Sequence, residues 1–355
     1  MHFGSDNAAG VAPEIIEAIS HANHGIAPSY GADPLTHSAE RRFCEIFERE
    51  VAVFLVATGG AANGLALSVL TPPYGMILCH EESHIQMDEC GGPEFFSGGA
   101  KLLPLEGFAA KLSVETVEKA LAGFPERAPH GPPARALSLT QASECGAVYR
   151  VGEIEALCAA AHAHGLSVHV DGARFANAVA KLGRSPAELT WKAGVGALSF
   201  GGTKNGCLAA EAVIFFDPEK AGDFIYRRKR AGHLLSKHRF IAAQFDAYLA
   251  DDRWLKYAAH ANAMAARLSS GLAAIDGVKI WYPTEANEVF AEFPDGAADG
   301  LRAAGASFYP WITPGDPSGG KMHRLIASFA TTEDEVDRFL ALARETIARS
   351  RTHQR

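Results

Sequence analysis

The chain of 355 residues lacks the features of a membrane protein and of a nucleic-acid-binding protein. Its longest apolar runs, residues 51–58 and 209–216, are far shorter than the roughly 20 residues that cross a bilayer. It has no block of like charges, and its net charge is −8, which gives no basic face for a polyanion. Residues 1–6 do not have the pattern of a signal peptide. We therefore expect a cytoplasmic protein whose partners are small molecules, with no nucleic acid and no membrane among them.

Cysteine motifs are also missing, although the chain has six cysteines. None forms a Cys-x-x-Cys pair and the spacing is irregular, so neither a zinc ribbon nor a disulfide framework is predicted. Two of the histidines, His162 and His164, fall at the end of a predicted helix, where imidazole favours the negative end of the helix dipole. We predict no metal site.

Short apolar runs alternate with helical stretches from residue 51 to 216, the pattern of a mainly parallel sheet with crossover helices. The clearest unit has Ile154, Leu157, Cys158 and Ala161 at helical spacing, a stop at Gly165, and then a strand. The predicted strands are 51–57, 76–79, 136–139, 166–170, 195–200 and 211–216. The sequence therefore predicts an α/β fold, and ligands of such folds bind at the carboxyl edge of the sheet.

The rest of the chain has a different order of elements. Helical patterns dominate from about 219 to 275, and strands at 278–282, 289–293 and 325–329 then alternate with helices near 298–304 and 332–349. This order predicts a smaller α+β domain. We expect an N-terminal segment at 1–25, a large domain at 26–255 and a small C-terminal domain at 256–355.

A lysine and an aspartate stand at the ends of two successive predicted strands. Asp171 closes the strand 166–170, and Lys204 lies just beyond the strand 195–200. Pyridoxal phosphate enzymes need both groups, because the carboxylate keeps the ring nitrogen of the cofactor protonated and the amine bonds its aldehyde. The pairing predicts a pyridoxal phosphate enzyme and makes the chain a candidate carbon–carbon lyase.

A glycine-rich turn follows the first predicted strand. Gly59, Gly60 and Ala61 open a helix, where free backbone amides face an anion such as a phosphate. The turn has neither the Lys-Ser/Thr pair of a Walker loop nor the spacing of a dinucleotide-binding loop. An ordinary tight strand-to-helix turn would look the same.

Four further polar residues are candidates for the site. His84 follows a strand and would stack on a pyridine ring, with Asp88 on the same face if the segment is helical. Arg174 lies near Asp171, and Arg324 enters a predicted strand of the small domain, where a guanidinium would hold an α-carboxylate. Taken alone, Arg174 fits a structural ion pair equally well, and His84 and Arg324 fit an ordinary surface or structural role better than a role in a site.

Four stretches together resemble the low-specificity L-threonine aldolases. They are Phe3-Gly4-Ser5-Asp6-Asn7, His84 with Asp88-Glu89-Cys90-Gly91-Gly92, Asp171-Gly172-Ala173-Arg174-Phe175-Ala176-Asn177-Ala178, and Phe200-Gly201-Gly202-Thr203-Lys204-Asn205-Gly206. The resemblance extends from Phe3 to about Thr332 and implies a pyridoxal 5'-phosphate enzyme with the aspartate aminotransferase fold (fold type I). It also implies a homotetramer built as a dimer of dimers.

The resemblance carries roles to individual positions. Lys204 would bond the cofactor, Asp171 would pair with the ring nitrogen and His84 would stack on the ring. Ser5, Arg174 and Arg324 would bind the substrate carboxylate. Gly59, Gly60 and Ala61 would bind the phosphate, and Tyr30 would reach in from a neighbouring subunit. The basic stretches 227–230 and 237–239 would add a phosphate contact from that neighbour.

The chain departs from the resemblance at two positions. Gly60 stands where many relatives have threonine, and Glu144 stands near the position where another branch has a histidine. The second difference leaves the base for the hydroxyl proton open.

The expected reaction is the cleavage of an L-β-hydroxy-α-amino acid such as threonine to glycine and an aldehyde. We expect His84, oriented by Asp88, to take the β-hydroxyl proton. The alternatives are an aminotransferase or a β-eliminating lyase of the same fold, and a nucleotide-binding protein without this cofactor.

Overall fold

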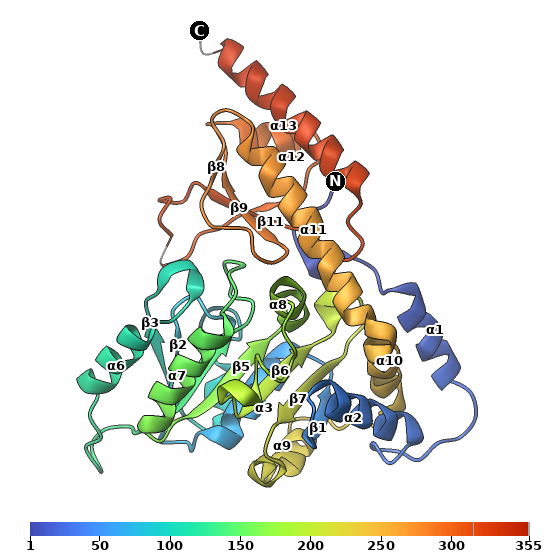
Figure 1. The fold of residues 1–355 in the computed structure, drawn as a ribbon, viewed down its shortest axis with the longest axis vertical. Coiled ribbons are helices and arrows are strands. Elements are labelled where there is room, and N and C mark those ends of the chain that lie inside the picture. The colour runs from blue at the N-terminus through green and yellow to red at the C-terminus, as the bar shows by residue number, and fades with distance from the viewer. Residues whose placement is uncertain (315, 354–355) are drawn as a thin grey trace.

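The computed structural model describes residues 1–314 and 316–353, which form a large sheet covered by helices and a smaller sheet above it (Figure 1). The helices are α1 (Pro13–Ala22), α2 (Pro34–Ile46), α3 (Gly59–Leu70), α4 (His84–Met87), α5 (Gly92–Ser97), α6 (Val114–Gly123), α7 (Val151–Ala163), α8 (Phe175–Leu182), α9 (Phe224–Arg230), α10 (Arg239–Leu249), α11 (Arg253–Ala273), α12 (Ala297–Ala303) and α13 (Glu333–His353). The strands are β1 (Ala52–Val56), β2 (Met76–His80), β3 (Lys101–Leu105), β4 (Ala134–Thr140), β5 (Ser167–Gly172), β6 (Ala197–Gly201), β7 (Glu211–Phe215), β8 (Lys279–Ile280), β9 (Glu288–Glu292), β10 (Tyr309–Pro310) and β11 (Met322–Ile326).

The large sheet has the strand order β1-β7-β6-β5-β4-β2-β3, and only β7 runs antiparallel to its neighbours. Strands β2, β6 and β7 are buried along their whole length, which is typical of a sheet with helices on both faces. One face packs on α2, α7, α8 and α10, and the other on α3, α5 and α9. The predicted α/β fold with a mainly parallel sheet is confirmed.

The smaller sheet is antiparallel, with the order β10-β11-β9-β8. Its core is built with α11, α12 and α13, and includes Phe3 from the start of the chain. The backbone of Phe3 joins this part through bonds to Ser307 and Ile326, so the N-terminal segment crosses to the smaller sheet. The division of the chain at residues 25 and 255 stays a prediction.

Some predicted elements are displaced or were missed. The strand expected at 325–329 is β11, Met322–Ile326. Phe329 does not continue it, because its ring packs on Tyr257 with centroids 5.4 Å apart. Strand β3 was not predicted, since it is short, contains Pro104 and lies at the sheet edge, where proline is tolerated.

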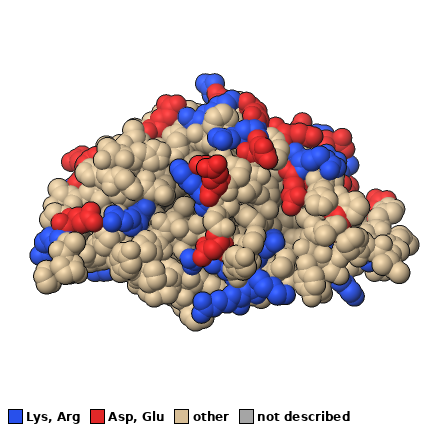
Figure 2. All heavy atoms as spheres, turned by 90° about the horizontal axis from the view of Figure 1, so that it is seen from below, with Lys and Arg blue, Asp and Glu red and all other residues tan. Residues whose placement is uncertain are grey.

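Surface features agree with a protein of mixed charge. Among the described residues no helix combines the length and apolarity needed to cross a membrane. Figure 2 shows one face on which Lys and Arg are interspersed with Asp and Glu over a largely uncharged surface.

Phe200, on β6 shortly before Lys204, is the centre of the aromatic core. Its ring is fully buried and lies 5.3 Å from Phe43 and 5.5 Å from Trp254, measured between centroids. We expect Phe200→Ala to lower the free energy of unfolding by about 3–5 kcal/mol, because it leaves a cavity among rings that cannot close over it. Urea denaturation followed by fluorescence measures the loss. The control is Phe95→Ala, whose side chain is 79% exposed, and an equal loss in both variants would contradict the assignment.

Candidate active site

A cavity of about 380 Å³ opens at the carboxyl ends of β4, β5 and β6, below the smaller sheet. It brings together most residues that the sequence singled out: Ser5, Gly59, Gly60, His84, Asp88, Asp171, Arg174, Lys204 and Arg324. Ala61 and Tyr30 do not line it. The sheet edge predicted to bind ligands therefore holds the cavity.

Asp171 lies near the end of β5 and is almost fully buried. Its Oδ2 accepts a hydrogen bond of 2.7 Å from the Asn63 side chain, and its Oδ1 accepts one of 3.0 Å from the Ala173 amide. Asn63 also donates to Glu89 at 2.8 Å. The carboxylate is thus fixed in orientation by neutral donors rather than by an adjacent cation.

Lys204 lies in a single turn of 3-10 helix, η4 (Thr203–Asn205), that follows β6. Asn205 anchors this turn by donating to the Tyr248 hydroxyl at 2.6 Å and to the Trp254 carbonyl at 2.8 Å. No hydrogen bond occupies the Lys204 amine within the described part of the chain. The amine is therefore available to a ligand in the cavity.

His84 opens α4, and its ring is held by a carboxylate. Nδ1 of His84 lies 2.9 Å from Oε1 of Glu89, whose side chain is only 3% exposed. The hydrogen bond that the His84 ring donates to Glu89 raises the pKa of His84, and burial raises the pKa of Glu89. A carboxylate on Nδ1 fixes the tautomer of the ring and leaves Nε2 as the position for proton exchange.

The expectation that Asp88 orients His84 is corrected by this contact. Helix α4 ends at Met87, and Asp88 has φ −127°, so the side chain four positions after His84 leaves the helical face. Asp88 still lines the cavity, while Glu89, one residue further, turns back to the ring.

The glycine-rich turn starts α3 as expected. Thr58 caps the helix, and its hydroxyl accepts a hydrogen bond of 3.3 Å from the amide of Ala61. The amides of Gly59 and Gly60 have no such partner among the described residues, so they and the positive end of the helix face the cavity. Ala61 takes part in the cap, which explains why it does not line the cavity.

Charged groups gather at the side of the cavity next to the smaller sheet. Arg174 binds Asp6 through two hydrogen bonds, of 2.8 and 3.1 Å, and Asn287 donates to the same carboxylate at 3.1 Å. Although burial opposes it, the Arg174 guanidinium holds the pKa of Asp6 below its ordinary value. Arg324 stacks on Trp311 at 4.4 Å, and its buried Nε has no hydrogen-bond partner within residues 1–314 and 316–353. Of the two arginines, Arg324 has the more available guanidinium.

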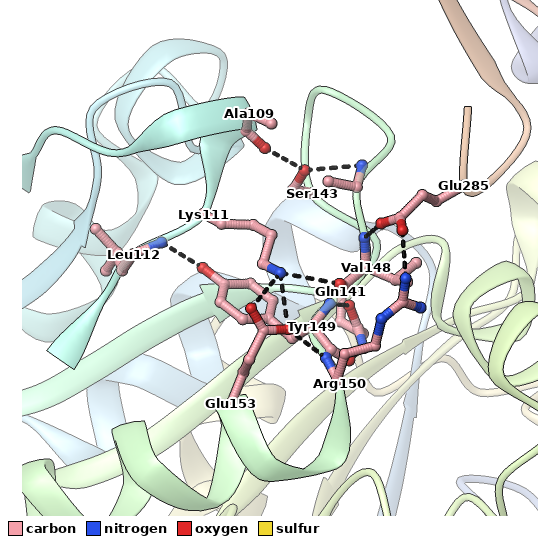
Figure 3. Close-up of polar contacts among 11 residues, drawn as sticks. Ala109, Lys111, Leu112, Gln141, Ser143, Val148, Tyr149, Arg150, Glu153 and Glu285 are labelled. Atoms are coloured by element: carbon pink, nitrogen blue, oxygen red, sulfur yellow. Dashed lines mark hydrogen bonds and ion pairs between the residues drawn. The ribbon is translucent and has the colours of Figure 1, made fainter. Parts of the chain in front are cut away.

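The segment 141–150 carries Ala142 and Glu144 into the cavity wall. Figure 3 shows its anchors: the Gln141 side chain binds both backbone groups of Tyr149, Lys111 binds the Val148 carbonyl, and Glu285 binds the Val148 amide. Glu285 comes from the loop before β9, so it ties this segment to the smaller sheet.

Glu144 is held next to His84 by this segment. Its Oε1 accepts a hydrogen bond from the His84 amide at 2.9 Å and another from the Thr140 hydroxyl at 2.8 Å. Burial, together with the nearby Asp171 charge, raises the pKa of Glu144 to about 7. The residue that departs from the family pattern thus fixes the backbone of His84.

Comparison with known proteins gives the family. The model described as "Beta-eliminating lyase" matches residues 2–295. A low specificity L-threonine aldolase of Pseudomonas sp. (strain NCIMB 10558) is 45% identical over 336 residues, covering 95% of each chain, and one of Pseudomonas aeruginosa is 44% identical over 345 residues, covering 97% of this chain and 96% of that protein. The chain belongs to the threonine aldolase family. The structure of Leishmania major threonine aldolase superposes with a TM-score of 0.90 at 26% identity, over 98% of this chain and 99% of that one.

The family is one of pyridoxal phosphate-dependent lyases of fold type I, and this member shares both properties. The donor set fits the cofactor. One cavity holds a primary amine on Lys204 for its aldehyde, the buried carboxylate of Asp171 for its ring nitrogen, and the free amides of Gly59 and Gly60 for its phosphate. The resemblance stated from the sequence is confirmed.

Several residues of this threonine aldolase site were not singled out from the sequence. Asn63 and Glu89 link Asp171 to His84, and Glu288 and Trp311 lie against Arg324. Glu89 had a signal, since it is a second acid directly after Asp88 in the same motif. Glu288 had none, because a glutamate at the start of a strand is ordinary until the fold places it beside two arginines.

The contact between Glu89 and His84 can be tested by titration. We expect Glu89→Gln to lower the pKa of His84, because the hydrogen-bonded carboxylate is the main cause of its elevation. NMR of ¹³C-labelled histidine as a function of pH measures the shift. Asp88→Asn is the matched control and should leave the pKa of His84 unchanged. A larger pKa shift in Asp88→Asn than in Glu89→Gln would refute the assignment.

Proposed function

We propose that this chain cleaves L-threonine, L-allo-threonine and related L-β-hydroxy-α-amino acids to glycine and an aldehyde. The observation that supports this most directly is one cavity that holds the free Lys204 amine, the buried Asp171 carboxylate and the available Arg324 guanidinium. The names of the two Pseudomonas relatives agree with it.

We propose the following places for the cofactor. Lys204 would bond its aldehyde, Asp171 would hold its ring nitrogen protonated, and His84 would stack on its ring. The start of α3 would receive the phosphate through the free amides of Gly59 and Gly60, while the expected contact from Ala61 is replaced by its bond to the Thr58 cap. When bound, pyridoxal phosphate supplies a π system that accepts the electron pair of the broken Cα–Cβ bond.

The substrate is oriented by the side of the cavity next to the smaller sheet. Arg324 binds the α-carboxylate, with Ser5 beside it. Arg174, whose fork is bound to Asp6, contributes its charge and holds the N-terminal segment in place. A fixed carboxylate would orient the bonds at Cα, and so would determine which of them breaks.

Proton transfer is the task of His84. Its Nε2 takes the β-hydroxyl proton, while Glu89 stabilises the charge that develops on the ring. Asp88 lines the same cavity, and we propose that it contacts the substrate hydroxyl through water.

Replacement of the anchor lysine tests the cofactor assignment. Lys204→Ala should lose both the absorbance of the lysine-bound cofactor and the formation of acetaldehyde and glycine from threonine, because no other lysine of the described residues lines the cavity. Lys192→Ala is the control, since Lys192 pairs with Glu48 on the surface. Retention of both signals in Lys204→Ala would refute the assignment.

The base is tested by His84→Asn. We expect kcat/KM for threonine to fall by about 10²–10⁴-fold, the usual contribution of general base catalysis, while the absorbance of the bound cofactor remains. Coupled detection of acetaldehyde gives the rate. Cleavage at nearly the parental rate would remove His84 from this role.

The same assay separates the related chemistries of the fold. An aminotransferase would need a keto-acid acceptor, and a β-eliminating lyase would release ammonia and a keto acid from its substrate. Formation of glycine and acetaldehyde from threonine without any acceptor distinguishes the aldolase from both.

We also propose a cytoplasmic homotetramer, a dimer of dimers, in which Tyr30 reaches the active site of a neighbouring subunit. Tyr30 is 51% exposed and lies outside the cavity of its own chain, with the Lys229 amine 4.7 Å from its ring centre. A residue so placed is available to another subunit, and the basic stretch that includes Lys229 would approach the neighbour's phosphate with it.

A further inference from the structure

Four charged side chains lie buried where the smaller sheet meets the cavity. They are Asp6, Arg174, Glu288 and Arg324, whose side chains are 2, 10, 0 and 22% exposed. Oε1 of Glu288 lies 3.5 Å from Nη2 of Arg174 and 3.9 Å from Nη1 of Arg324. Two acids and two arginines balance in formal charge before any substrate is present.

The two acids are held in very different ways. Asp6 accepts hydrogen bonds from Arg174 and Asn287. Glu288 is fully buried at the start of β9, and neither of its oxygens accepts a hydrogen bond from a described residue. A buried carboxylate without hydrogen bonds is costly in its charged form. Burial therefore raises the pKa of Glu288, although Arg174 and Arg324 oppose the shift.

Glu288 cannot easily move away from the arginines. Its strand is paired with β11, where Glu288 stands opposite Ile326, and its Cβ packs closely on Gly146, at which an added Cβ would meet it at 3.1 Å. The charged and titratable groups that face it come from several elements: Asp6, Cys145, Arg174, Lys204 and Arg324. The backbone and Cβ of Glu288 are therefore held beside the arginines, which leaves neutralisation of its charge as the way to release Arg324 without moving the strand.

An arriving amino acid brings a further carboxylate to Arg324, which is the role given to that residue in the proposed function. Two carboxylates then share one guanidinium, and the buried cluster has one negative charge too many. Protonation of Glu288 removes the excess, and Glu288 is the acid with the least stabilised charge.

We propose that Glu288 is an internal counter-ion of the carboxylate subsite. Glu288 pairs with Arg324 until the amino acid arrives. It then takes up one proton from solvent as the substrate carboxylate replaces it beside Arg324. Glu288 acts through Arg324 and is a positioning residue. The inference rests on the proposed binding of the α-carboxylate by Arg324.

The sign of the pH dependence follows from this exchange. Below the pKa of Glu288 in the free enzyme the acid is already neutral, and amino acids bind Arg324 without competition. Above it, binding must include proton uptake, so affinity falls by about tenfold per pH unit. The fall stops where the pKa of Glu288 in the complex is passed.

The experiment uses the cofactor-loaded enzyme and glycine, which has no Cβ and cannot be cleaved. Isothermal titration at about pH 8 in buffers of different ionisation enthalpy counts the protons taken up. We expect wild-type enzyme to take up about one proton more than Glu288→Gln. We also expect Glu288→Gln to bind glycine more tightly at this pH, because the competing charge is gone, and the ratio of the two affinities to grow by about tenfold per pH unit between the free-enzyme and complex pKa values of Glu288.

Two controls isolate the carboxylate subsite. Glu292→Gln changes a glutamate at the other end of the same strand, hydrogen-bonded to Trp281, and should behave as wild type. Ethylamine, which has an amine and no carboxylate, should bind wild type and Glu288→Gln alike. Because Lys204 changes its own bonding when amines bind, only the difference between variant and wild type is interpreted.

An equal proton count in both proteins, or unchanged or weaker glycine affinity in Glu288→Gln, would overturn the proposal. If Glu288→Gln does not fold, as judged by its melting temperature and bound cofactor, the wild-type enzyme decides. The quantity to follow is the ratio of the affinity for glycine to the affinity for ethylamine. A ratio that stays constant between about pH 6 and pH 9 would refute the proposal, and a ratio that falls at high pH would support it. A wild-type enzyme that binds neither cofactor nor glycine would instead contradict the proposed function.

Discussion

The parallel pairing of β5 with β6 is the constraint on which the site depends. In this register Asp171 stands opposite Ser199, so the carboxylate and the turn that carries Lys204 emerge at the same edge of the sheet. The two chain segments approach so closely beyond the strands that a Cβ at Gly201 would lie 2.6 Å from the Ala173 carbonyl oxygen. Only glycine permits this approach. The relative position of Asp171 and Lys204, the two proposed cofactor anchors, is therefore fixed by backbone packing rather than by flexible side chains.

Around Asp171 and Lys204, the polar side chains of the cavity wall hydrogen-bond to one another, because the wall is largely buried. Asn63 joins Asp171 to Glu89, Glu89 joins His84, and the amide of His84 joins Glu144. Such a chain of hydrogen bonds satisfies buried groups that would otherwise be costly, and it fixes the ring of His84 before any ligand arrives. It also concentrates acids, so that burial moves the pKa of Glu144 to about 7 and that of Glu89 upwards.

The side of the cavity that we propose for the substrate is formed by both sheets. Asp6 comes from the N-terminal segment, Arg174 follows β5 of the large sheet, and Glu288 and Arg324 lie on β9 and β11 of the smaller sheet. Phe3 packs in the core of the smaller sheet while Asp6 binds Arg174, so the N-terminal segment fastens one sheet to the other. A carboxylate bound at this side of the cavity would contact groups from both sheets. The distances between these groups depend on how the two sheets are joined.

The sequence by itself determined the fold class and the positions of the main strands along the chain, and it singled out Asp171 and Lys204, because hydrophobic periodicity and strand-end residues are local properties. It also placed the glycine-rich turn at the start of α3, since helix starts have local chemistry. Tertiary structure alone decided that Glu89 rather than Asp88 holds His84, that Phe329 leaves β11, and that Glu288 faces the arginines. Contacts such as that of Glu288 with Arg174 join residues far apart in the chain or depend on where a short helix ends. No local pattern encodes them, because their energy comes from burial and charge that exist only after the elements have packed.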